Sequence, residues 1–158
     1  MNDALLTRIA EALERLAPPT ASCADLAAAP AYIWDGHAVH PVQDFAPVDY
    51  DLLTGIDAQK EALLANSARL ADGYASHDVL LWGARGTGKS AAVAAVVGKL
   101  QQGGRDIALI QCAIDQLASL PSLFAMLRGS DRPFVLFLDD LGFDEQGAGD
   151  ARALRSLL

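Results

Sequence analysis

The octapeptide GARGTGKS at residues 83–90 matches the pattern G-x-x-x-x-G-K-[ST], whose residue types suit the binding of phosphate groups. Its glycines allow the backbone to turn back on itself, so that main-chain N–H groups can point toward phosphate oxygens. The ammonium group of Lys89 can reach the β- and γ-phosphates of a nucleotide, and the hydroxyl group of Ser90 suits Mg²⁺. The candidate phosphate-binding residues are Gly83, Ala84, Arg85, Gly86, Thr87, Gly88, Lys89 and Ser90.

The segments on either side of this loop support the interpretation, because such a loop has to follow a strand and open a helix. The apolar residues 79–82 precede it and predict a short strand. The Ala- and Val-rich residues 90–100 follow it and predict a helix, whose N-terminal N–H groups and dipole favour an anion. The alternative is a glycine-rich turn that contains a lysine by chance.

A second pair of residues that could do chemistry, Asp139 and Asp140, follows the apolar run FVLFL at 134–138. Such a run predicts a strand whose C-terminal end lies beside bound phosphate, the Walker B arrangement. We expect Asp139 to assist Mg²⁺, directly or through water, and Asp140 to accept a proton from the attacking water. The alternative is a solvated strand end, which the phosphate-binding loop upstream disfavours.

Asp140 stands where ATP hydrolases commonly carry Glu, and its side chain is one methylene shorter. Because reach matters for proton transfer, we expect slow turnover, or a geometry that a neighbouring subunit completes. The sequence contains no Asn-Lys-x-Asp signature for guanine, so the expected ligand is ATP with Mg²⁺.

The elements that must position these residues alternate between strand and helix. Strands that are apolar on both faces and separated by helices indicate an α/β fold, with a parallel sheet covered on both sides. Pro121 is expected to break or offset the last predicted helix. The predicted strands are 79–82, 106–112 and 134–138, and the predicted helices are 90–100 and 115–128.

The chain before these elements predicts an N-terminal region at 1–50, followed by the nucleotide-binding part at 51–158. Residues 3–17 predict a helix that ends at two prolines. We expect its apolar stripe to pack on this chain or a neighbouring subunit, since a helix that lies on a membrane is usually more basic. The stripe consists of Leu5, Ile9, Leu13 and Leu16, with Leu6 beside it.

Two further elements are predicted between residues 31 and 73. The dipeptide Asp35-Gly36 between short apolar runs indicates a small β-hairpin, which we interpret as a polar arm. Its residues His37 and His40 have no further His or Cys nearby, which disfavours a metal site. A helix is predicted at 56–73, with Gly73 as its C-cap. Its apolar face consists of Ile56, Leu63, Leu64 and Leu70.

Composition disfavours several classes of function. The chain has 158 residues, 52% of them hydrophobic, enough for about one domain with a core. Its net charge of −8 and its scattered Lys and Arg residues argue against direct binding of nucleic acid. No apolar run approaches the roughly 18–20 residues of a membrane span, and no signal peptide is present, so we expect a cytoplasmic protein without a membrane partner. Cys23 and Cys112 match no metal or redox spacing, and reduced thiols are expected.

LLWGARGTGKS followed by FVLFLDDLGFDE resembles a bacterial AAA+ ATP-binding family of uncharacterised function, whose members pair a GxRGTGKS loop with a DDLxF Walker B motif. The likeness covers roughly residues 50–158. AAA+ proteins of the helicase-loader type share the Asp-Asp-Leu-Gly run and are close competitors. The resemblance implies that the region of Gly55 and Ile56 lies near the adenine. It also implies a homo-oligomeric ring of the full-length protein, in which an arginine from a neighbour completes the site.

The fold that this resemblance implies is a P-loop NTPase of AAA+ type, a three-layer sandwich with a parallel sheet in the strand order 5-1-4-3-2. The chain supplies what look like strands 1, 2 and 3. Strand 4, strand 5, the arginine finger and the helical lid are missing, so we expect a sheet that is incomplete at the C-terminus and a longer natural protein. The alternative is a compact P-loop fold, as in nucleotide kinases and GTPases.

Three functions stay open from the sequence. The first is an ATPase that hydrolyses Mg²⁺–ATP to drive a conformational change in an unknown protein partner. The second is an ATP-dependent binding module with negligible hydrolysis, which Asp140 in place of Glu favours. The third is a small nucleotide kinase, for which no acceptor-binding residues are evident.

Overall fold

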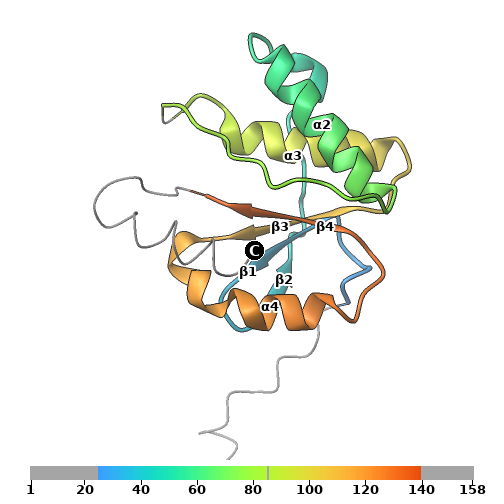
Figure 1. Ribbon diagram of the computed structural model, residues 1–158, viewed down its shortest axis with the longest axis vertical. Coiled ribbons are helices and arrows are strands. Elements are labelled where there is room, and N and C mark those ends of the chain that lie inside the picture. Colours follow the sequence, from blue (N-terminus) through green and yellow to red (C-terminus); the bar gives the residue numbers. More distant parts are fainter. Residues whose placement is uncertain (1–24, 85, 140–158) are drawn as a thin grey trace, which may run out of the picture.

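Four short strands form the sheet that organises the molecule. The computed structural model describes residues 25–84 and 86–139. β1 pairs antiparallel with β2 and parallel with β3, and β3 pairs parallel with β4. The fold is therefore α/β with an open, mostly parallel sheet (Figure 1). Across the sheet the order is β2 (Val39–Pro41), β1 (Ala31–Trp34), β3 (Ala108–Cys112) and β4 (Phe134–Leu138).

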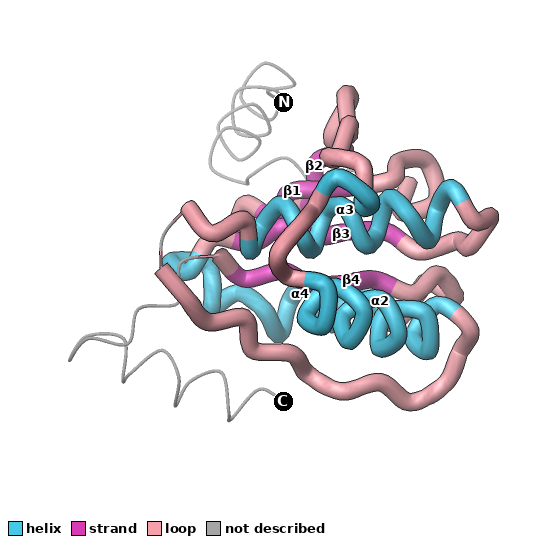
Figure 2. The backbone as a smooth tube through the Cα atoms, turned by 90° about the horizontal axis from the view of Figure 1, so that it is seen from above, coloured by secondary structure: helices cyan, strands magenta, loops and turns pink. Residues whose placement is uncertain are grey.

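Helices cover both faces of this sheet. α2 (Asp57–Ala71) and α3 (Lys89–Gln102) lie on one face, and α4 (Leu120–Leu127) lies on the other (Figure 1). Seen from above, α2 and α3 lie side by side (Figure 2). Two 3₁₀ helices, η1 (Tyr50–Leu52) and η2 (Ile114–Ser119), precede α2 and α4 along the chain. The three layers agree with the predicted α/β arrangement. Within the two described ranges, no helix is both long and apolar enough to cross a membrane.

The core consists of two apolar clusters, one on each face of the sheet. β3 contributes to both, with Ile110 in the cluster beside α4 and Leu109 in the cluster beside α3. A strand covered on both faces has to be apolar at successive positions, which confirms the prediction for this segment. The buried residues that α3 adds to the second cluster are Val93, Ala95, Val96, Val97 and Leu100.

The hairpin predicted at Asp35-Gly36 is present, but its first strand is an inner strand of the sheet rather than part of a polar arm. Tyr32 and Trp34 of β1 are buried, and the Trp34 indole donates a hydrogen bond to Ser119 Oγ at 2.7 Å. The interpretation as a polar arm was wrong because the polar residues belong only to the turn and to the edge strand β2. The hairpin, β3 and β4 therefore form one sheet.

Residues 79–82, which were predicted as a strand, form no strand in the structure. Their side chains are largely exposed, and Trp82 is 85% exposed. The chain just before them is held against α2 instead. The Asn66 side chain donates to the His77 carbonyl oxygen at 2.7 Å and accepts from the His77 N–H at 2.9 Å. A strand needs a hydrogen-bonded neighbour, and none of the four described strands pairs with this segment.

The other described elements agree with the predictions to within a few residues. The helix expected at 115–128 is divided into η2 and α4, with Pro121 in the first turn of α4. Gly73 follows the end of α2 with a φ of +78°, and the next N–H, that of Tyr74, bonds back to the Arg69 carbonyl oxygen at 2.8 Å. This arrangement confirms Gly73 as a terminator of the helix.

Several predictions fall on residues outside the described ranges. They concern the N-terminal helix at 3–17, the thiol of Cys23, the loop residue Arg85, the acid Asp140, and residues 141–158.

Candidate functional site

The loop at 83–90 leads directly into α3. Gly88 is the N-cap of this helix and has a φ of +84°, a left-handed conformation that glycine adopts without strain. Lys89 is the first helical residue. Because Gly88 has no side chain that could cap the helix, it leaves the first N–H groups of α3 available. A helix N-terminus of this kind favours an anion.

The side chain of Lys89 lies across the loop. Its Nζ donates hydrogen bonds to the carbonyl oxygens of Gly83, at 3.1 Å, and Ala84, at 3.0 Å. The Thr87 hydroxyl also donates to the Ala84 carbonyl oxygen, at 2.8 Å. The ammonium group is thus bound to neutral acceptors, and hydrogen bonds to phosphate oxygens would be stronger because the acceptor is charged.

Ser90 and Asp139 lie in contact, although 49 residues separate them in sequence. The Ser90 hydroxyl donates to Asp139 Oδ2 at 3.1 Å. Ser90 lies in the first turn of α3, and Asp139 directly follows β4, where its N–H bonds to the Cys112 carbonyl oxygen at 3.4 Å. The fold therefore brings together the two residues that the sequence predicts as partners of Mg²⁺. They meet at the carboxyl end of the parallel strands, the usual place for ligands in such sheets.

This pair of residues suits Mg²⁺ that arrives with a nucleotide better than Mg²⁺ held by protein alone. Among the described residues, no group of three or more His, Cys, Asp and Glu side chains could hold a metal ion. Ser90 and Asp139 offer a hydroxyl and a carboxylate, which are hard oxygen ligands. Mg²⁺ commonly binds one or two such protein oxygens together with substrate phosphates and water. The residues present therefore fit the predicted metal.

The predicted adenine contacts lie before α2. Gly55 is exposed with a φ of +79°, and Ile56 is the N-cap of α2. Just before them, the Asp51 carboxylate accepts from Lys99 Nζ at 3.2 Å. Lys99 lies ten residues beyond Lys89 on α3, about 15 Å along the helix axis. The role of Gly55 and Ile56 toward a base stays a prediction.

Near this segment the structure contains a buried lysine that the sequence reasoning missed. Lys60 Nζ donates to the Leu53 carbonyl oxygen at 2.8 Å, contacts Asp57 Oδ1 at 3.0 Å and lies 4.9 Å from the ring centroid of Tyr50. The hydrogen bond that Lys60 donates to the Asp57 carboxylate raises the pKa of Lys60 above its ordinary value. The signal was present in the spacing, because Lys60 lies three residues before the buried Leu63 on the same helical face.

Two further candidates for chemistry have structural roles. Cys112 is a free, buried thiol, and burial, followed by the nearby Asp115 carboxylate, raises its pKa, which keeps it protonated. His40 Nε2 lies 2.6 Å from Asp35 Oδ2 within the hairpin. This contact ties the edge strand β2 to the turn residue Asp35.

Comparison with known protein families gives a match over most of the chain. A family model described as "Protein of unknown function (DUF815)" matches residues 27–158. This range includes β1, β3, β4, the loop at 83–90 and Asp139. No curated protein and no solved structure matches the chain.

Proposed function

We propose that this chain, which belongs to the DUF815 family of proteins of unknown function, binds ATP together with Mg²⁺ at the loop 83–90. The observation that carries the proposal is the contact between Ser90 Oγ and Asp139 Oδ2. A chance match to a phosphate-loop pattern would not require an acid from a distant strand end beside its last residue. The proposal also draws on the position of the loop at the N-terminus of α3, where an anion is favoured.

The residues would divide the work as follows. Main-chain N–H groups of loop 83–90 bind phosphate oxygens, and Lys89 exchanges its bonds to the Gly83 and Ala84 carbonyl oxygens for bonds to phosphate. Ser90 and Asp139 hold Mg²⁺, which neutralises charge on the phosphates when bound. Arg85 and Asp140 are assigned to the proposed site on the basis of the sequence alone.

Calorimetric titration with Mg²⁺–ATP tests the binding. Lys89→Ala is expected to lower ATP affinity roughly a hundredfold, about 2.7 kcal/mol, because charge-assisted hydrogen bonds to phosphate are lost. The control is Lys99→Ala, which removes a lysine from the same helix and should leave the affinity unchanged. Equal affinities in wild type and Lys89→Ala, both folded by circular dichroism, would refute binding at this loop.

We further propose AAA+ character, on the resemblance of the loop and the Asp139-Asp140 pair to that family. Hydrolysis then depends on Asp140 as the group that accepts a proton from water. Phosphate release from the protein, wild type against Asp140→Asn, separates an ATPase from a binding module. A rate above background that Asp140→Asn abolishes identifies an ATPase. Background rates in both, with ATP still bound, identify a module that binds without turnover.

A further inference from the structure

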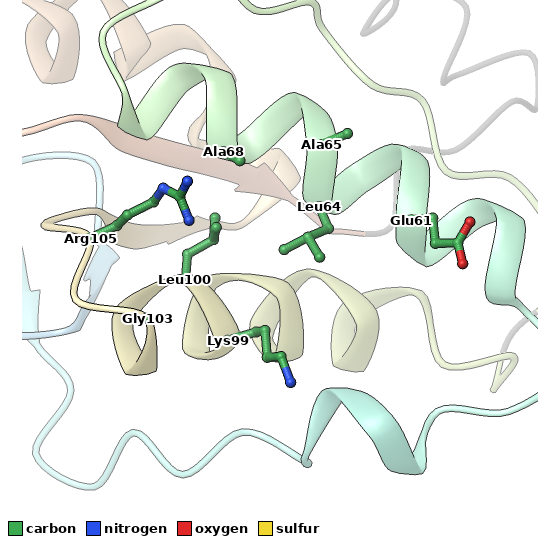
Figure 3. Close-up of a pocket in the computed structure, with 8 residues that line it drawn as sticks. All are labelled: Glu61, Leu64, Ala65, Ala68, Lys99, Leu100, Gly103 and Arg105. Atoms are coloured by element: carbon green, nitrogen blue, oxygen red, sulfur yellow. The ribbon is translucent and has the colours of Figure 1, made fainter.

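A groove runs between α2 and α3 on the outer surface of the molecule, away from the loop at 83–90. Its volume is about 490 Å³. Figure 3 shows Leu64 of α2 and Leu100 of α3 pointing into the space between the two helices. Small residues widen it, since Ala65 and Ala68 line it from α2 and Gly103 lines it from the end of α3. The volume falls within the range of sites that bind ligands or side chains, about 300–1,000 Å³.

Charged residues of opposite sign border this apolar floor. Glu61 lies on α2, and Lys99 lies on α3, where it pairs with Asp51 at 3.2 Å. Arg105 follows α3, and its guanidinium turns toward α2 (Figure 3), where it pairs with Asp72 at 2.8 Å. Because both cations already have partners, the groove suits an occupant with an apolar stripe and a basic flank that faces Glu61. That description fits an amphipathic helix better than a small apolar molecule.

We propose that this groove is the docking site of the chain's own N-terminal segment, residues 3–17. The segment has the required pattern, an apolar stripe at helical spacing. At 100° per residue, Arg8 and Arg15 fall on one flank of that stripe, and Asp3 and Glu14 fall on the other. The basic flank would face Glu61.

The point where the described chain begins lies close enough to the groove for this docking. One guanidinium group, that of Arg132, donates to the Leu26 carbonyl oxygen at 2.8 Å and contacts Asp106 Oδ1 at 2.7 Å. Asp106 is the neighbour in sequence of Arg105, which lines the groove. The seven residues 18–24, which include two prolines, can span about 20 Å when extended. The segment can therefore reach the groove of its own molecule.

Photo-crosslinking in the full 158-residue chain tests the docking without reference to nucleotide. A benzoylphenylalanine at Ala65 is expected to crosslink, within the monomer, to peptides from residues 1–15. The same group at Ala118, which is exposed on the α4 side of the sheet, should not. Ile9→Asp combined with Leu13→Asp should lower the crosslink yield at least tenfold, because two aliphatic side chains lose their burial. Thr7→Asp, on the polar side of the predicted helix, should leave it unchanged.

Charge exchange provides a second measurement that does not depend on the folding of any one variant. Glu61→Arg should lower the crosslink yield, and Arg8→Glu combined with Arg15→Glu should restore it. Crosslinks that join two copies, that map outside residues 1–15, or that form equally from Ala118 would overturn the proposal. So would unchanged yields in the Ile9→Asp, Leu13→Asp variant.

Discussion

At the scale of single residues, the contact between Ser90 and Asp139 predicts how ATP binding depends on Mg²⁺. If both residues serve the metal, Ser90→Ala or Asp139→Asn should weaken ATP binding about tenfold, or about 1.4 kcal/mol, when Mg²⁺ is present. With Mg²⁺ chelated, both variants should bind ATP as the wild type does. The double variant should lose little more ATP affinity than the single variant that binds ATP more weakly, because the two residues act on one ion.

Titration with a fluorescent ATP analogue, with and without chelator, measures these affinities. A loss of the same size in both conditions would mean that Ser90 and Asp139 act on the loop structure rather than on a metal ion.

A second residue-scale prediction concerns Asp35, whose carboxylate holds the hairpin turn. The N–H groups of Ala38 and His37 and the ring of His40 lower the pKa of Asp35 well below its ordinary value of 3.8. Because the folded-state pKa is depressed, the stabilisation is complete above about pH 4 and is lost as the pH falls below that value. Asp35→Asn should be less stable than wild type at pH 7, and the difference should shrink between pH 4 and pH 2.

Urea denaturation at pH 7, 4, 3 and 2 measures this difference directly. A difference that stays constant over the whole range would show that the charge of Asp35 contributes nothing, and that only the shape of its side chain matters.

At the scale of elements, two similar apolar runs of the sequence form different structures. AYIW at 31–34 is an inner strand with neighbours on both sides, whereas VLLW at 79–82 is largely exposed and is paired with no described strand. Local sequence cannot distinguish them, because strand formation depends on partners that are distant along the chain. α3, β3 and β4 could be predicted because their signals are local, namely an Ala- and Val-rich run after the loop at 83–90 and two short apolar runs.

The residues of the candidate site could be predicted from the sequence, but not all of their positions. The spacing of GARGTGKS and the acids after an apolar run identified its residues, and the fold brings Ser90 and Asp139 together as expected. The position of the Lys89 ammonium over the Gly83 and Ala84 carbonyl oxygens was not predictable, since it depends on the folded path of the loop. The buried Lys60 was missed because lysine side chains are almost never fully buried.

An element-scale prediction follows from the packing of Gly98 in α3. A Cβ at this position would lie 2.6 Å from Pro47 Cγ, closer than two carbon atoms can approach. Gly98→Ala should therefore destabilise the fold by about 1–2 kcal/mol, although alanine favours a helix over glycine by about 1 kcal/mol. Thermal denaturation measures the effect. Pro47→Ala should rescue the stability of Gly98→Ala, and a rescue of zero would show that the two residues do not collide.

At the scale of the whole molecule, Arg132 joins three parts of the chain that are distant in sequence. Its Nη1 donates to the carbonyl oxygens of Leu26 at 2.8 Å and Ala29 at 2.7 Å, before β1. Its Nε lies 2.7 Å from Asp106 Oδ1, before β3, as a close ion pair without the alignment of a hydrogen bond. Arg132 itself lies before β4. The amino ends of all three parallel strands therefore meet at one largely buried guanidinium group.

This arrangement predicts that the two hydrogen bonds from Arg132 to the carbonyl oxygens stabilise the fold more than its ion pair with Asp106 does. Arg132→Lys keeps the charge but cannot reproduce the guanidinium geometry, so it should lower the free energy of unfolding by about 2–3 kcal/mol. Asp106→Asn should cost less than about 1 kcal/mol, because the Asp106 carboxylate is 76% exposed and solvent screens the pair. Urea denaturation of both variants measures the two losses. Equal losses would mean that the ion pair, and not the two carbonyl contacts, holds the strand ends together.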